Sequence, residues 1–261
     1  MSSVSPPVVL AFAASDPTGG AGLQADLLTI AALGCHPLSV VTALTAQDTR
    51  GVERVLPVEA SWITRQARVV LDDIAVAAFK AGVLGSAQNV RAVSELVAEH
   101  AEVPFVVDPV LASGRGDPLA EENAIEALRE LILPRTTMLT PNSLEARRLA
   151  DGASDLAECA RRLVDQGCEY VLITGTHEAG ADVVNTLYDD SGVVREDRWP
   201  RLPGNYHGSG CTLASAIAAR LAQGLEPPEA ARDAQHFTWD ALAAGFKPGS
   251  GQFLPNRFFR R

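Results

Sequence analysis

The stretch VVLAFAASDPTGGAGLQADLLTIAAL, residues 8–33, decides the fold class because it contains a strand pattern, a Gly-rich loop and a helix pattern in direct succession. Residues 8–14 are an uninterrupted apolar run, which is typical of a strand buried on both faces of a parallel sheet. The glycines of residues 15–22 permit a tight turn or a close approach of the backbone to a ligand. A helix is predicted over residues 22–33, ended by Gly34.

The same succession recurs along the rest of the chain. Strands are predicted over 38–46, 76–84, 105–111, 138–140 and 170–174, and helices over 62–74, 90–100, 120–131, after Asn142, and over 156–166, 212–223 and 228–244. Residues 183–188 and 193–199 flank an Asp-Asp-Ser-Gly turn and predict a hairpin. This alternation predicts an α/β fold with a mostly parallel, doubly wound sheet between two layers of helices.

Composition limits the possible domain organisation, location and binding partners of the chain. The 261 residues show no repeat and no Pro/Gly/Ser-rich linker, which favours one domain over residues 1–261. No apolar run approaches the ~20 residues of a membrane span, and the first residues lack the pattern of a signal peptide. The net charge is −10 without a clustered Lys/Arg stripe, so a nucleic-acid partner is not expected. The four cysteines form no CxxC pair, which favours a reducing cytoplasm.

Ligands of open α/β sheets bind beyond the carboxyl ends of the strands, and polar motifs recur at these positions. The loop over residues 15–22 is the first, although it lacks the GxGxxG spacing of a dinucleotide site and also fits a purely structural turn. Asp26, in the following helix, either faces the mouth of a pocket or is solvated. Gln47 follows the second strand, where its amide suits the edge of an aminopyrimidine ring, or where it belongs to a simple polar loop.

Two further motifs carry carboxylates. Asp108 is followed by Pro109 at the end of a strand, where it suits a magnesium shell or caps a local turn. Asn142 and Glu145 fit the start of a helix with a capping box. Glu145 could instead reach Mg²⁺ or its water shell.

The sequence HGSGCT, residues 207–212, opens a helix and carries the most information. The glycines on either side of Ser209 free backbone N–H groups at a helix N-terminus, which suits a transferring phosphoryl group. Cys211 falls in the first helical turn, where the helix dipole is expected to lower the pKa of the thiol. A buried cysteine behind a Gly turn is the alternative, and His207 is expected to be structural.

Taken in order, these motifs resemble the hydroxymethylpyrimidine/phosphomethylpyrimidine kinases of the ribokinase superfamily. The resemblance rests on residues 15–22, 24–26, 41–51, 80–86, 107–110, 116–118, 140–145 and 207–216. It implies a ribokinase-like α/β/α sandwich, commonly dimeric, that uses ATP and Mg²⁺. The implied substrates are 4-amino-5-hydroxymethyl-2-methylpyrimidine and its monophosphate.

The resemblance also implies a role for individual residues. The expected catalytic group is Gly208, Ser209, Gly210 and Cys211, where the glycines and Ser209 form the anion hole and Cys211 stands where most ribokinase-like enzymes have Asp. The expected substrate-binding residues are Gln47, Asp26, Gly20, Val83 and Val110. The expected nucleotide-binding residues are Thr174, Thr176, Asn142 and Arg115, and the expected metal-binding residues are Asp108 and Glu145.

Three positions depart from the pattern of that family. Thr174 stands where many relatives have Lys, so a phosphate-binding cation is missing there, and Arg115 is expected to supply charge instead. Val83 replaces a common Met in the ring pocket. Ser209 replaces the usual Thr.

The motifs also suggest a mechanism, and they leave alternative functions open. In the first reaction Cys211 would accept or orient the proton of the substrate hydroxyl, whereas in the second reaction the nucleophile is a phosphate monoester that is already ionised near neutral pH. A pyridoxal or pyridoxine kinase on the same fold is the main rival. A non-catalytic pyrimidine- or B6-binding protein and a dehydrogenase are the others, and the missing dinucleotide fingerprint argues against the last.

Overall fold

The computed structural model describes residues 5–112 and 119–260, and within them the strands form a nine-stranded sheet with the order β3-β2-β1-β4-β5-β6-β7-β8-β9. The strands are β1 (Val8–Ser15), β2 (His36–Gln47), β3 (Val52–Pro57), β4 (Ala78–Ala81), β5 (Phe105–Val107), β6 (Met138–Leu139), β7 (Tyr170–Thr174), β8 (Asp182–Asp189) and β9 (Gly192–Pro200). Strands β2, β1, β4, β5, β6 and β7 are parallel, while β3, β8 and β9 join antiparallel.

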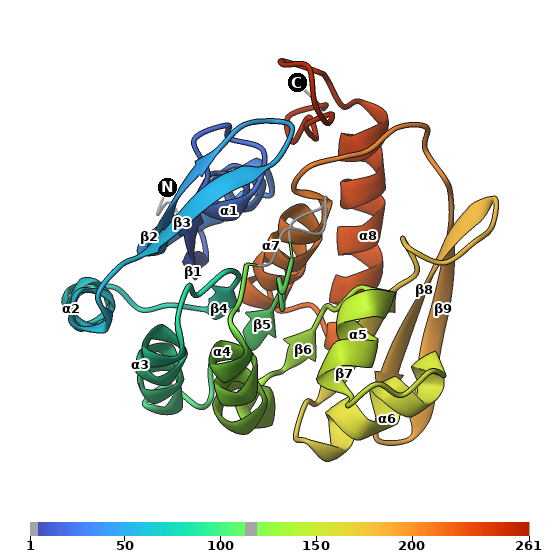
Figure 1. Cartoon of the computed structure of the whole chain (residues 1–261). Helices are drawn as coiled ribbons and strands as arrows, with labels where there is room; N and C mark the ends of the chain where they lie inside the picture. Colours follow the sequence, from blue (N-terminus) through green and yellow to red (C-terminus); the bar gives the residue numbers. More distant parts are fainter. Residues whose placement is uncertain (1–4, 113–118, 261) are drawn as a thin grey trace.

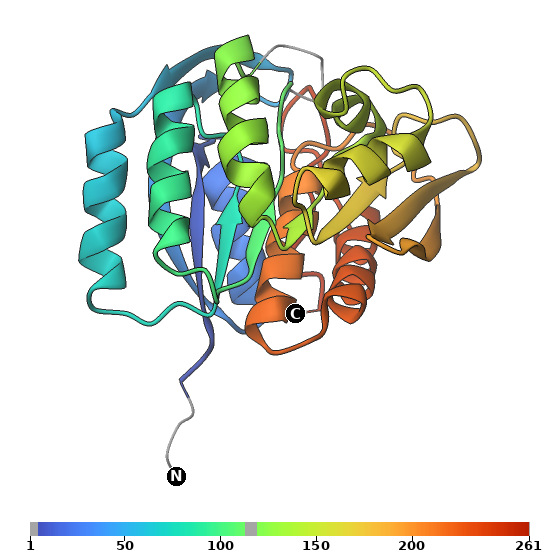
Figure 2. The same ribbon diagram turned by 90° about the horizontal axis from the view of Figure 1, so that it is seen from below.

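Helices cover both faces of this sheet (Figures 1 and 2). One face carries α2 (Ala60–Leu71), α3 (Ala87–Ala98), α4 (Glu122–Ala127), α5 (Ser143–Leu149) and α6 (Leu156–Asp165), and the other carries α1 (Gly22–Ala32), α7 (Ser209–Ala222) and α8 (Pro227–Ala243). A π-helical turn (Leu128–Ile132) and a 3-10 turn (Leu133–Arg135) extend α4. The predicted three-layer α/β/α architecture with a mostly parallel, doubly wound sheet is confirmed.

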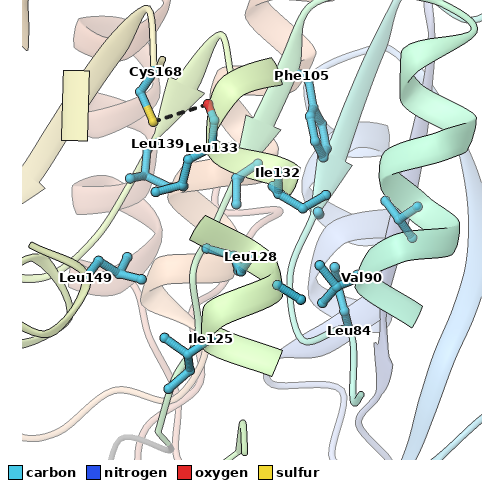
Figure 3. Close-up of a cluster of buried hydrophobic side chains, with 14 of the residues drawn as sticks. Leu84, Val90, Phe105, Ile125, Leu128, Ile132, Leu133, Leu139, Leu149 and Cys168 are labelled. Atoms are coloured by element: carbon cyan, nitrogen blue, oxygen red, sulfur yellow. Dashed lines mark hydrogen bonds between the residues drawn. The ribbon is translucent and has the colours of Figure 1, made fainter. Parts of the chain in front are cut away.

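A hydrophobic core lies on each face of the sheet, and both cores follow from the apolar runs of the strands. Val9 and Leu10 are adjacent in β1, yet Val9 packs towards α1, α7 and α8 and Leu10 towards the helices of the opposite face. This is the two-residue period of a strand buried on both sides. Figure 3 shows part of the larger core, where Phe105 lies near the leucines and isoleucines of the α4 region and the Cys168 thiol lies 3.6 Å from the carbonyl oxygen of Leu133.

The predicted hairpin at β8 and β9 is confirmed, but β3 was not predicted. Residues 48–51 close a second hairpin, in which Asp48 Oδ1 accepts hydrogen bonds from the N–H groups of Arg50 and Gly51. The residues of β3 alternate weakly and are mostly exposed, so hydrophobic periodicity does not identify this strand. Within residues 5–112 and 119–260, no helix combines the length and the apolar character needed to cross a bilayer.

Candidate active site

A cavity of about 710 Å³ opens at the carboxyl ends of the parallel strands. Among the residues singled out from the sequence, the cavity wall contains Gln47, Val83, Asp108, Val110, Asn142, Glu145, Thr174, Thr176, Gly208, Ser209, Gly210 and Cys211. Gly20 and Asp26 are not part of this wall, and Arg115 lies outside the described residues. Motifs separated by more than a hundred residues therefore meet in one site, as the rule for open α/β sheets predicts.

The Gly-rich loop after β1 is organised by Asp16. Its carboxylate accepts hydrogen bonds from Thr18 N at 2.8 Å, Thr18 Oγ1 at 2.9 Å and Ala21 N at 2.7 Å. Burial alone would raise the pKa of Asp16, but hydrogen bonds from His207, Gln47, Thr18 and Ala21 outweigh it and hold the pKa well below its usual range. Asp16 is therefore an ionised anchor that shapes the loop.

A second carboxylate, Asp26, lies beneath the cavity. It is fully buried, so the two sequence-based placements, pocket mouth and solvent, are both wrong. Both Asp26 oxygens accept from Lys80 Nζ, at 2.8 and 2.9 Å, and Ser215 Oγ donates to Oδ1 at 2.7 Å. Lys80, on β4, is also fully buried. Burial alone would lower the pKa of this lysine. The negative charge of Asp26 raises the pKa by more than burial lowers it, so Lys80 stays charged.

Helix α7 begins at the floor of the cavity. Its N-cap, Gly208, has φ = 85°, and a Cβ at this position would overlap the carbonyl oxygen of Gly20. Only glycine fits both the backbone conformation and the contact. The first N–H groups of an α-helix have no partner within the helix, and here they face the cavity together with the positive end of the helix dipole. The residues predicted to form the anion hole lie beside Asp108, whose Oδ1 would be 3.4 Å from a Cβ at Gly210.

Cys211 is in the first turn of α7, but the expected lowering of the pKa of its thiol is wrong. Burial and the negative charges of Asp108 and Asp26 raise the pKa to about 12, and the positive charge of Lys80 offsets this only in part. The thiol and the Asp108 carboxylate each shift the pKa of the other, Cys211 lowering that of Asp108 and Asp108 raising that of Cys211. The helix dipole acts on this thiol, but the nearby carboxylates and the low polarity dominate.

Asp108 and Glu145 form a pair of buried carboxylates. Glu145 Oε2 accepts from Asn142 N at 2.9 Å and Asn142 Oδ1 accepts from Glu145 N at 3.0 Å, so the predicted capping box is present. Asp108 Oδ2 is buried without a hydrogen-bond partner among the described residues. Burial raises the pKa of Asp108 to about 6, and burial with repulsion from Asp108 raises the pKa of Glu145 to about 8. An unpartnered carboxylate oxygen beside a second carboxylate fits a divalent cation.

Thr174, the last residue of β7, and Thr176, two residues further on, also line the cavity. The expected lysine is absent at Thr174, but Arg201, which follows β9, lies in the cavity wall. Its guanidinium donates to the carbonyl oxygens of Thr176 and Glu178, each at 2.8 Å, and of Gly180 at 3.0 Å. All of these acceptors are backbone carbonyl oxygens. Among the described residues, no carboxylate accepts a hydrogen bond from Arg201 and neutralises its charge.

Three cations of the site region were not predicted, namely Lys80, Arg201 and Arg257. Arg257 is buried, and its guanidinium donates to Gly20 O at 2.6 Å and to Thr212 Oγ1 at 3.1 Å. It therefore joins the Gly-rich loop to the first turns of α7. Arg201 and Arg257 belong to none of the motifs quoted above. Lys80 opens the quoted stretch 80–86, but its partner Asp26 lies 54 residues away in the sequence. A charged residue within an apolar strand, as Lys80 is, was the one available signal.

The sheet order, the cavity at the strand ends and the Gly-capped α7 define a kinase of the ribokinase-like class. Residues 16–256 match the model of the phosphomethylpyrimidine kinase family, and the chain belongs to this family.

Relatives support this assignment. The chain is 46% identical over 258 residues to a hydroxymethylpyrimidine/phosphomethylpyrimidine kinase of Streptomyces coelicolor, covering 95% of this chain and 93% of that protein. It is 40% identical to the enzyme of the same description from Mycobacterium tuberculosis, covering 98% and 96%.

Solved structures agree on the fold and include a second activity. The pyridoxal kinase of Staphylococcus aureus, in complex with AMP-PCP and pyridoxal, superposes with a TM-score of 0.88 at 29% identity, covering 98% of this chain and 94% of that one. The phosphomethylpyrimidine kinase of Clostridium difficile 630 superposes with a TM-score of 0.78 at 32% identity, covering 90% and 99%. Both are kinases, which argues against the binding-protein and dehydrogenase alternatives.

Proposed function

We propose that this chain transfers the γ-phosphate of ATP to 4-amino-5-hydroxymethyl-2-methylpyrimidine, and then a second phosphate to the monophosphate, in thiamine biosynthesis. The observation that carries the proposal is the Gly-capped N-terminus of α7, which lies in one cavity with Asp108 and Gln47. The names of the relatives point to the same two reactions.

Phosphoryl transfer depends mainly on positioning and on neutralising charge. Backbone N–H groups at the start of α7 would bind the transferring group, while the charge of Lys80 is balanced by its ion pair with Asp26. Asp108 and Glu145 would hold Mg²⁺, which neutralises phosphate charge when it is bound. The S. aureus relative, solved with AMP-PCP, supports ATP as the donor.

Cys211 would orient the hydroxymethyl group rather than act as a standing thiolate. A thiol whose pKa is about 12 is neutral near pH 7. A neutral thiol at this position can still fix the direction of the attacking hydroxyl through its own lone pairs.

A pyridoxal kinase is the second candidate, because the S. aureus structure with pyridoxal superposes closely. Pyridoxal has a ring of similar size and also bears a hydroxymethyl group. The replacement of Met by Val83 in the ring pocket bears on this choice, since it changes the space around the ring.

The test is ADP release by the purified protein with ATP and Mg²⁺, comparing hydroxymethylpyrimidine, its monophosphate and pyridoxal. Turnover of both pyrimidine compounds with slow turnover of pyridoxal would support the proposal. Turnover of pyridoxal alone would move the protein to B6 salvage. Binding of the ring compounds without any ADP release would revive the binding-protein alternative.

Assembly, compartment and domain organisation also remain proposals. A homodimer is supported by the exposed edge hairpin, where Leu44 and Leu56 are cross-strand partners and are 49% and 56% exposed. The cytoplasm is supported by the free thiols of Cys35, Cys159 and Cys168, which are all buried. A single domain is supported by the one continuous sheet. Light scattering coupled to gel filtration would give the mass of the assembly.

A further inference from the structure

His207 and Asp16 surround the amide of Gln47. His207 Nε2 lies 2.9 Å from Asp16 Oδ2, and Gln47 Nε2 lies 3.5 Å from the same histidine nitrogen. All three side chains line the cavity. The family resemblance gives a role to Gln47, but none to the other two.

The charge of Asp16 decides which way the Gln47 amide points. An ionised carboxylate accepts hydrogen bonds and donates none. His207 Nε2 must therefore carry the hydrogen that faces Asp16, 2.9 Å away. Gln47 Nε2 lies 3.5 Å from the same histidine nitrogen, and Gln47 lowers the pKa of Asp16, so the NH₂ group of the amide faces the carboxylate. The reversed amide would place Oε1 against the negative charge of Asp16. Among the residues that the structure describes, no hydrogen-bond donor is placed on Gln47 Oε1, so this oxygen is left for a ligand.

We propose that Asp16 and His207 are positioning residues that hold the Gln47 amide with Oε1 towards the substrate, and so select a ring that carries a hydrogen-bond donor beside its hydroxymethyl group. The proposal rests on the proposed function, because it takes the ring to lie against Gln47.

The candidate rings differ in whether the group beside the hydroxymethyl group donates or accepts a hydrogen bond. The 4-amino group of hydroxymethylpyrimidine donates to an amide oxygen. The aldehyde oxygen at the matching position of pyridoxal only accepts, as does the 4-oxo group of the pyrimidine analogue in which oxygen replaces the amino group. An acceptor held against an acceptor leaves both without a partner in a water-poor site, and this mismatch discriminates strongly between substrates.

The measurement is kcat/KM for the 4-amino pyrimidine divided by kcat/KM for its 4-oxo analogue. We expect a ratio of at least about 100 for the unmodified protein. Asp16→Asn introduces an NH₂ group that can donate to Gln47 Oε1, so the amide can reverse. His207→Leu removes the N–H group 2.9 Å from Asp16 Oδ2 and 3.5 Å from Gln47 Nε2, so the amide loses one of the two groups that surround it. Each is expected to reduce the ratio about tenfold.

His207→Gln keeps an N–H donor near the position of Nε2 and is expected to restore part of the ratio. Gln24→Leu is the matched control, because Gln24 holds the same loop through Asp16 N at 2.8 Å and Ser15 Oγ at 2.9 Å without being a hydrogen-bond partner of Gln47. It is expected to reduce turnover of both substrates alike, with an unchanged ratio.

A ratio near one in the unmodified protein, or a ratio that His207→Leu leaves unchanged, would overturn the proposal. The ratio measured for the two substrates with the unmodified protein remains a test of the proposal even if Asp16→Asn disturbs the loop. Failure of the proposed function looks different, since the protein would then turn over neither pyrimidine compound while still phosphorylating pyridoxal.

Discussion

At the scale of single residues, Cys211 shows how its neighbours override a helix terminus. The thiol is next to Asp108 and above the Lys80–Asp26 pair, and its pKa is raised to about 12. We expect Cys211→Ala to reduce kcat on the hydroxymethylpyrimidine about a hundredfold, and on the monophosphate less than about fivefold, because an ionised phosphate needs no help to attack.

Cys211→Ser separates orientation from base catalysis. A serine hydroxyl can orient the substrate but is a far poorer anion than a thiolate, so most of the first reaction is expected to survive in this variant. Single-turnover rates with each substrate would measure both effects. Equal losses in the two reactions would contradict a role for Cys211 in handling the hydroxyl proton.

Arg201 is expected to supply the phosphate-binding positive charge that many relatives provide with a lysine at the position of Thr174. Its guanidinium fixes the loop that begins at Thr176 and adds positive charge to the cavity wall. Arg201→Ala should raise KM for ATP about tenfold with little change in KM for the pyrimidine. Arg198→Ala is the control, because Arg198 pairs with Glu196 at 2.7 Å on the same strand and is not in the cavity wall. An unchanged KM for ATP in Arg201→Ala would reject this role.

Asp16 is expected to make the protein sensitive to acid. Its folded pKa is depressed below the ordinary value of 3.8, so the folded state resists protonation that the unfolded chain accepts. The stabilisation is present above this value and is lost as the pH falls below it. Between pH 4 and pH 2, urea denaturation should show a steeper loss of unfolding free energy for the unmodified protein than for Asp16→Asn, by up to about 1.4 kcal/mol per pH unit. Parallel curves would contradict this.

At the scale of elements, the two ends of α7 make different demands on glycine. Gly208 and Gly224 have nearly the same φ, 85° and 86°, but a Cβ at Gly224 meets nothing within 4 Å. Gly224→Ala should cost about 1 kcal/mol of backbone strain and leave activity intact. Gly208→Ala should cost more and abolish most turnover, because α7 and the Gly-rich loop must move apart. Thermal melts and ADP release on both variants would test this difference.

Elements with strong local signals were predictable from sequence. The apolar run of β1, the capping box at Asn142 and the hairpin turn before Gly192 each depend on residues within a few positions of one another. β3 was missed because its side chains are mostly exposed and its pairing with β2 supplies what its own pattern lacks. The pKa of Cys211 was misjudged because the decisive carboxylates are Asp108, which directly follows β5, and Asp26 on α1.

At the scale of the whole molecule, a buried ion pair joins the centre of the sheet to one helical layer. Lys80 lies on β4, Asp26 on α1 and Ser215 on α7. Lys80→Met should lower the free energy of unfolding by about 3–5 kcal/mol, because it leaves a carboxylate buried without its cation. The double variant Lys80→Met/Asp26→Leu should lose less than Lys80→Met alone.

Arg68→Met is the control for this comparison. Arg68 and Glu99 form an ion pair at 2.6 Å between half-exposed side chains, and its removal should cost less than about 1 kcal/mol. Urea denaturation of the unmodified protein, Lys80→Met, Asp26→Leu, the double variant and Arg68→Met would decide. A double variant that loses the sum of the two single losses would show that the pair does not act as a unit.

The overall site could be placed from sequence because strand ends converge on one edge of the sheet. Its inner supports could not, since Lys80 and Asp26 are 54 residues apart and Ser215 lies 189 residues from Asp26. The region near the C-terminus added little to the sequence interpretation, yet Arg257 reaches the Gly-rich loop. Such contacts depend on how the layers stack, which no local pattern records.

The bond between Arg257 and the Gly-rich loop has a consequence for the order of events on the ribosome. Gly19 and Arg257 are separated by 238 residues. At ordinary elongation rates, roughly ten to fifty seconds pass between the synthesis of the loop and that of its clamp. The nascent chain thus carries its Gly-rich loop unfastened until residue 257 has emerged, and only then can the contact between this loop and the first turns of α7 be completed.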